Sequence, residues 1–145
     1  MIDLKRYAQF WDEVRDRVPG IKSTCFVTLE ANIADKVMRI RGEQTPTLFF
    51  LAPSAELSGD IDSTVARNRC AVMVLEKFSS TTATAADILI RTQPVVECVL
   101  AELGELCRCV CGEMTPEIST VSILPETELL AGWAGWSILF TIDTD

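Results

Sequence analysis

Three cysteines within five residues, Cys107, Cys109 and Cys111, form the pattern in this sequence that most suggests chemistry. Clustered thiolates could hold a metal ion or form a redox pair. On a helix, however, Cys107 and Cys111 share a face, and Cys109 points elsewhere. A structural zinc site needs four ligands at turn-like spacing, so a further cysteine would have to come from another part of the chain. We interpret these cysteines as buried structural residues, with a thiol-dependent or metal enzyme as the competing hypothesis.

The chain contains no histidine. This excludes Ser-His-Asp and Cys-His catalysis, acid–base catalysis by histidine, and every zinc site that uses a histidine. No glycine-rich phosphate-binding loop is present either. Glu102 precedes Glu105 by three residues, so the two can lie side by side on a helix, but we interpret them as part of a solvated face. We therefore predict no catalytic residue, no metal, no cofactor and no enzymatic activity.

Two short segments contain residues suited to contact with a partner. Leu129, Leu130 and Trp133 lie in a connection between predicted strands, and tryptophan is enriched at the energetic centres of interfaces. Trp133 could equally pack on its own sheet, and the sequence leaves both alternatives open. Asp60 and Asp62 lie in a stretch rich in serine and glycine, with too few further oxygen ligands for a calcium loop. We predict these five residues as interface residues.

The spacing of apolar residues predicts three helices, over residues 3–18, 32–41 and 84–111. The last of these contains Pro94, which removes one helical hydrogen bond. Because the apolar stripe keeps its phase across Pro94, we predict one kinked helix rather than two.

Runs of β-branched, aromatic and other apolar residues predict five strands. They cover residues 23–30, 47–52, 69–78, 118–124 and 136–142. The last run alternates apolar and other residues as a half-buried strand does. Residues 53–68 are polar and rich in turn formers, and they predict a long surface loop.

The resulting order of elements, α-β-α-β-β-α-β-β, lacks the strict alternation of a parallel α/β fold. It predicts a single α+β domain over residues 1–145, in which helices pack on a mostly antiparallel, mixed sheet of about five strands.

Charge is distributed unevenly along the chain. Residues 1–91 contain 12 basic and 12 acidic side chains, whereas residues 92–145 contain one basic and nine acidic ones, which accounts for the net charge of -8. An acidic surface does not bind DNA phosphates, so we expect no direct sequence-specific nucleic-acid binding. The acidic face either aids solubility or docks on a subunit of complementary charge.

Hydropathy gives no sign of export or membrane insertion. No apolar run approaches the roughly 20 residues that span a bilayer, and residues 1–18 lack the apolar core of a secretory signal. We therefore expect no membrane partner, and reduced cysteines in a cytoplasm.

The C-terminal sequence resembles a known group of proteins. After Ala131-Gly132-Trp133, the run GWSILFTI from Gly135 to Ile142 is similar to the last strand of small tail-assembly proteins of tailed bacteriophages and prophages. The order of elements is also similar to that of the tail terminator and tail-completion group. The resemblance implies a ring-forming homo-oligomer that contacts other tail or neck proteins, first in the host cytoplasm and then in the virion tail. The alternative is a cytoplasmic domain that binds a small ligand or peptide between its sheet and its long helix.

Overall fold

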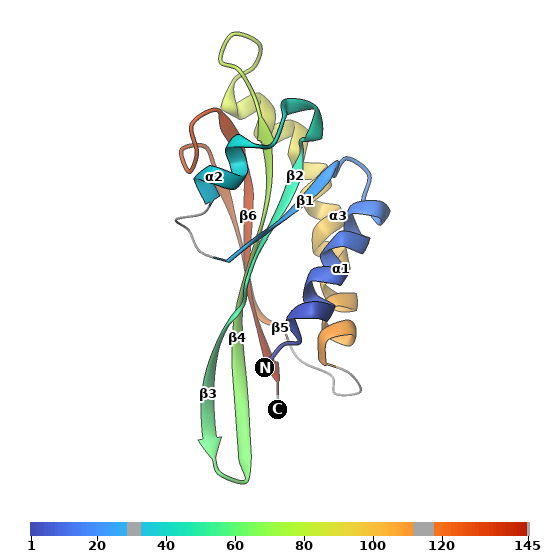
Figure 1. The fold of residues 1–145 in the computed structure, drawn as a ribbon, viewed down its shortest axis with the longest axis vertical. Coiled ribbons are helices and arrows are strands. Elements are labelled where there is room, and N and C mark those ends of the chain that lie inside the picture. The colour runs from blue at the N-terminus through green and yellow to red at the C-terminus, as the bar shows by residue number, and fades with distance from the viewer. Residues whose placement is uncertain (29–32, 112–117, 145) are drawn as a thin grey trace.

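One six-stranded sheet with helices on both faces forms the computed structural model, which describes residues 1–28, 33–111 and 118–144. The elements follow the chain as α1 (Leu4–Arg17), β1 (Ser23–Val27), α2 (Ile33–Met38), a short 3-10 helix η2 (Gly42–Gln44), β2 (Thr47–Leu51), β3 (Ser54–Asp60), β4 (Ser63–Lys77), α3 (Ala85–Cys111), β5 (Ile118–Glu126) and β6 (Trp133–Thr144). The predicted α+β class with a mostly antiparallel sheet is confirmed, with one strand more than expected (Figure 1). No described helix is long and apolar enough to cross a membrane.

The strands lie in the order β1-β2-β4-β6-β5. β1 and β2 run parallel, and all other neighbours are antiparallel. β4 is the longest strand and pairs with β6 from Ala66↔Thr144 to Lys77↔Trp133. Along its opposite edge it pairs first with β3 and then with β2. The sheet is therefore organised around β4 and β6.

Helices α1 and α3 cover one face of the sheet. The helical spacing of their apolar residues places these residues on one side of each helix, and that side packs on the sheet. Asp3 begins α1, because its Oδ1 accepts hydrogen bonds from the backbone N–H groups of Lys5 and Arg6 at 2.9 and 3.1 Å. Buried residues of both helices pack against alternate residues of β2, β4 and β6 in one large core. α3 is a single continuous helix with Pro94 inside it, as predicted.

The opposite face of the sheet has a second, smaller core at one end only. It consists of residues from α2 and four strands: Val27, Val37, Phe49, Met73, Leu75 and Trp133. The part of this face nearer the C-terminus of β6 has no helix over it among the described residues, and Leu139 is 41% exposed there. One half of the outer face is thus buried, and the other half is open.

The predicted loop over residues 53–68 is wrong, because β3 and the first part of β4 form a β-hairpin there. β3 and β4 pair from Ser54↔Arg69 to Asp60↔Ser63, and a turn at Ile61 and Asp62 connects them. All seven residues of β3 are exposed. We call residues 54–69 the arm, because they extend past the rest of the molecule (Figure 1). The polar sequence misled the prediction, since a strand exposed on both faces has no apolar alternation.

Gly135 sits where β6 passes closest to β4. Its φ is +157°, and an added Cβ would lie 1.9 Å from the carbonyl oxygen of Val74. We expect Gly135→Ala to lower the free energy of unfolding by about 1–3 kcal/mol, because the two central strands must move apart. Urea denaturation followed by circular dichroism measures this. Gly104→Ala on α3 is the matched control, since nothing lies within 4 Å of its Cβ position and alanine favours a helix by about 0.5–1 kcal/mol. Equal effects of the two changes would contradict the close approach.

Candidate functional site

The cysteines do not gather into a site among the described residues. Cys107 is buried in the main core, whereas Cys109 is exposed. The interpretation of the cluster as buried residues is therefore wrong for Cys109, because residues two apart on a helix face different directions. The Cys111 side chain lies outside the described residues. Cys25, Cys70, Cys98, Cys107 and Cys109 form no disulfide bonds. In the described part of the chain, no group of three or more His, Cys, Asp or Glu side chains could hold a metal ion.

Burial also makes Cys25 a poor nucleophile. Removal from water raises the pKa of its thiol above the ordinary value, although the charge of Lys36 acts in the opposite direction. Because the thiolate is the reactive form, a raised pKa reduces reactivity at neutral pH. Thiol catalysis therefore gains no support from this residue.

Cys109→Ser is expected to change the free energy of unfolding by less than about 0.5 kcal/mol, because the side chain is exposed. Cys107→Ser on the same helix is the matched variant. It exchanges a buried thiol for a more polar hydroxyl in the core, a change of the kind that usually costs about 0.5–3 kcal/mol. Urea denaturation compares the two variants. Zinc in the purified protein, measured by elemental mass spectrometry and lost with Cys109→Ser, would contradict a purely structural role.

The candidate carboxylate pair is divided between two ion pairs. Glu102 accepts a hydrogen bond from Arg17 of α1 at 2.9 Å, and Glu105 pairs with Arg108 at 3.0 Å. The bond to Glu102 raises the pKa of the Arg17 guanidinium. Each carboxylate thus has its own cation, and the arrangement links α1 to α3 instead of forming an acid–base pair.

Trp133 is the predicted interface residue whose position is most informative. It is 4% exposed, and its ring packs edge-on against Phe49 with 5.8 Å between centroids. The structure therefore favours packing on its own sheet over contact with a partner. Leu129, by contrast, is 48% exposed, and Leu130 is partly buried beside the same core. The three residues are neighbours in sequence, but the leucines retain most of the accessible surface.

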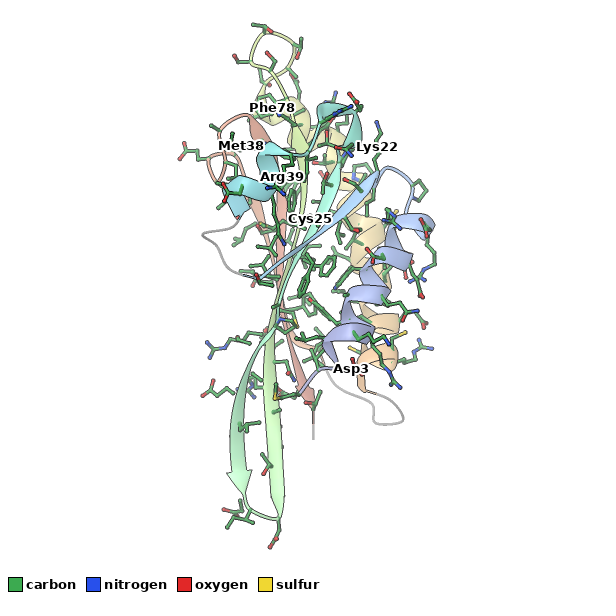
Figure 2. All side chains as sticks on the ribbon, viewed as in Figure 1. Asp3, Lys22, Cys25, Met38, Arg39 and Phe78 are labelled. Atoms are coloured by element: carbon green, nitrogen blue, oxygen red, sulfur yellow. The ribbon has the colours of Figure 1, made fainter. Side chains whose placement is uncertain are left out.

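A groove of about 210 Å³ lies where this connection meets α2. Its apolar lining consists of Ala34, Val37, Met38, Leu130, Ala131 and Trp133. Lys77 is its charged lining residue. We call this the α2 groove. Met38 and Arg39 lie at this end of the molecule, away from the arm (Figure 2).

The arm brings Asp60 and Asp62 together at its tip, on either side of Ile61. Ile61 is 100% exposed. In the part of the chain that the structure describes, neither carboxylate forms an ion pair, whereas the arm's stem is cross-linked by Arg67–Asp143 and Arg69–Glu56 pairs. The hydrogen bond to Asp143 raises the pKa of the Arg67 guanidinium. Ion pairs therefore hold the base of the arm, whereas the two carboxylates at its tip have no ion-pair partner among the described residues.

A buried asparagine fixes the base of the arm. Asn68 is 1% exposed, and its Oδ1 accepts a hydrogen bond from the backbone N–H of Ile2 at 3.3 Å. Its Nδ2 donates to the carbonyl of Ile142 at 2.9 Å and to Oγ1 of Thr144 at 3.1 Å. One side chain therefore joins the N-terminus, β4 and the end of β6.

The open half of the outer sheet face contains a second hollow, of about 280 Å³. Its polar lining includes Arg69, Thr120, Ser122 and Thr141. Beside it, β5 pairs with β6 and, among the described strands, with no other. An edge strand presents backbone groups that can pair with another chain. The hollow and the β5 edge are therefore candidate binding surfaces, as is a smaller hollow of about 180 Å³ lined by residues of α1 and by Cys109 of α3.

Comparison with known proteins assigns no family to this chain. No protein-family model matches it, and no curated protein matches it in sequence. We therefore argue its function from its own surfaces.

Sequence reasoning named Asp60 and Asp62 but missed Ile61 between them, and it missed the groove beneath α2. Ile61 could have been recognised in the sequence, because it is the one large apolar residue in the polar run SGDIDST over residues 58–64. The groove had none, because its lining comes from α2, β4 and the connection before β6, which only the folded chain brings together.

Proposed function

We propose that this chain is a structural subunit without catalytic activity that assembles with copies of itself, of the terminator or connector type found in phage tails. The arm is the observation that carries the proposal. Near its tip only two strands pair, and a two-stranded hairpin alone has little stability in water. Soluble proteins usually shorten or cover such exposed strands. An arm of this length with an apolar residue at its tip is typical of a segment that is covered in an assembly.

The surface charges fit the same proposal. The last third of the chain is acidic, which suits contact with differently charged tail or neck proteins. It also suits a channel lining that does not hold passing DNA. In this proposal the subunit assembles in the host cytoplasm and ends in the virion tail.

The test is the solution mass of the untagged protein, measured by light scattering over a range of concentrations. The monomer has a mass of 16.0 kDa. A discrete multiple of this value, or growth towards one as concentration rises, would support assembly and lead to electron microscopy of the particles. A strict monomer at every concentration would contradict self-assembly.

Binding of a small ligand or peptide is the second candidate function. The hollow of about 280 Å³ beside the β5 edge favours it, since a peptide can add to an exposed edge strand. The space between the sheet and α3, where we expected such a pocket, is occupied by core side chains from both. A strict monomer that retains a bound molecule after purification would favour this function over assembly.

A further inference from the structure

The arm tip and the α2 groove complement each other in shape and polarity. The tip presents one fully exposed apolar side chain, Ile61, between two carboxylates. The groove is a mainly apolar hollow with Lys77 in its lining and Arg39 immediately after Met38. A hollow of about 210 Å³ can accept one aliphatic side chain. Burying an isoleucine there would contribute about 1.5–3 kcal/mol.

The charges at the two ends are opposite, and both are without ion-pair partners among the described residues. Lys36, Arg39 and Lys77 form no ion pairs there, although Lys36 donates to the carbonyl of Phe26. The neighbouring carboxylates are Asp35, Glu76 and Glu128. Glu76 already pairs with Arg91 at 2.8 Å, so the cations without an ion pair outnumber the remaining carboxylates. At the tip, Asp60 and Asp62 form no ion pair with any residue that the structure describes. Each end therefore has the charge that the other lacks.

The arm tip lies at one end of the molecule's long axis, and α2 lies in the opposite half of the molecule (Figure 1). Met38 and Arg39 are on the α2 end in Figure 2. The tip therefore cannot reach the groove of its own chain. A second copy of the chain, by contrast, supplies a groove of the right polarity to every tip.

We propose that the arm tip of one copy docks in the α2 groove of the next copy, with Ile61 on the apolar lining and Asp60 and Asp62 beside Lys77 and Arg39. This inference rests on the proposed self-assembly and specifies its contact. The contact joins two different surfaces, so it is heterologous and produces a ring when the rotation closes, or a filament when it does not.

The charge distribution also disfavours the hollow on the sheet as the tip's docking site. This hollow is lined by residues of β4, β5 and β6, none of them acidic. Its one cation, Arg69, already pairs with Glu56 at 3.1 Å. The hollow therefore offers no unpaired cation to the two carboxylates of the tip, whereas the groove has Lys77 in its lining.

The test exchanges the charges of the two surfaces. The tip variant carries Asp60→Lys and Asp62→Lys, and the groove variant carries Arg39→Glu and Lys77→Glu. All four side chains are exposed, so both variants should fold, which circular dichroism and urea denaturation verify. Each variant alone should fall to the monomer mass of 16.0 kDa in light scattering. An equimolar mixture should assemble again, because each variant can dock on the other. The lysine tip of the tip variant fits the glutamate groove of the groove variant, and the native tip of the groove variant fits the native groove of the tip variant.

The control variant is Asp16→Lys with Glu97→Lys, which changes the net charge as the tip variant does but on exposed positions of α1 and α3. It should keep the wild-type mass. Wild-type protein that is a monomer would overturn the proposed function and this inference together. A wild-type oligomer that neither variant disrupts, or that the mixture fails to restore, would overturn the arm-to-groove contact alone and leave self-assembly standing.

Discussion

Replacing Trp133 with alanine is expected to lower the free energy of unfolding by about 3–5 kcal/mol, the usual cost of removing a buried tryptophan. Trp133 is 4% exposed and fills the centre of the smaller core between Phe49 and Leu130. Small domains are stable by about 5–15 kcal/mol, so the loss would be a large part of the total. Urea denaturation followed by circular dichroism and tryptophan fluorescence measures it.

Leu129→Ala is the matched control for this change, because Leu129 lies in the same connection but is 48% exposed. It should alter the free energy of unfolding by less than about 0.5 kcal/mol. If Trp133→Ala left stability unchanged and lowered only the mass of the assembly, Trp133 would be an interface residue and its burial in the monomer would be wrong.

Shortening the arm is expected to reduce the assembled protein to a monomer without unfolding it. Replacing residues 58–65 with Asn-Gly would connect the paired residues Leu57 and Ala66 directly, since Asn-Gly favours the tight hairpin turn. Seven of the eight removed residues are exposed, so little buried apolar area is lost. Light scattering reports the mass, and urea denaturation should show a change below about 1 kcal/mol.

The two readouts separate the possible results of this experiment. Monomer mass with unchanged stability supports the arm as the assembling segment. An assembly of unchanged mass would show that subunits meet elsewhere, with the edge of β5 as the next surface to alter. Loss of stability would show that the arm's outer half supports the fold, contrary to its exposure.

The elements that the sequence predicted well are those with one buried face. α1, α3 and β6 each pack a regular apolar stripe on the sheet, and that regularity is visible along the chain. Even there, the burial of single residues depended on the fold: within α1, Leu4 is 48% exposed, whereas Phe10 is buried.

The arm and the α2 groove could not be predicted in the same way. β3 is held by backbone pairing with β4 and by ion pairs such as Arg69–Glu56, and neither produces an apolar period. The two alternatives for Trp133 were equally open in the sequence, because burial depended on Phe49, a residue 84 positions away that only strand pairing brings near. Tertiary packing therefore brings the residues of the α2 groove together, and no local sequence pattern predicts them.

Asn68 has a consequence for the order in which the chain folds. Its side chain bonds to Ile2 and Ile142, which lie 140 positions apart in sequence. Contacts between residues far apart in sequence form late, because closing a long loop costs chain entropy. The base of the arm is therefore expected to become ordered only after β4 and β6 have paired.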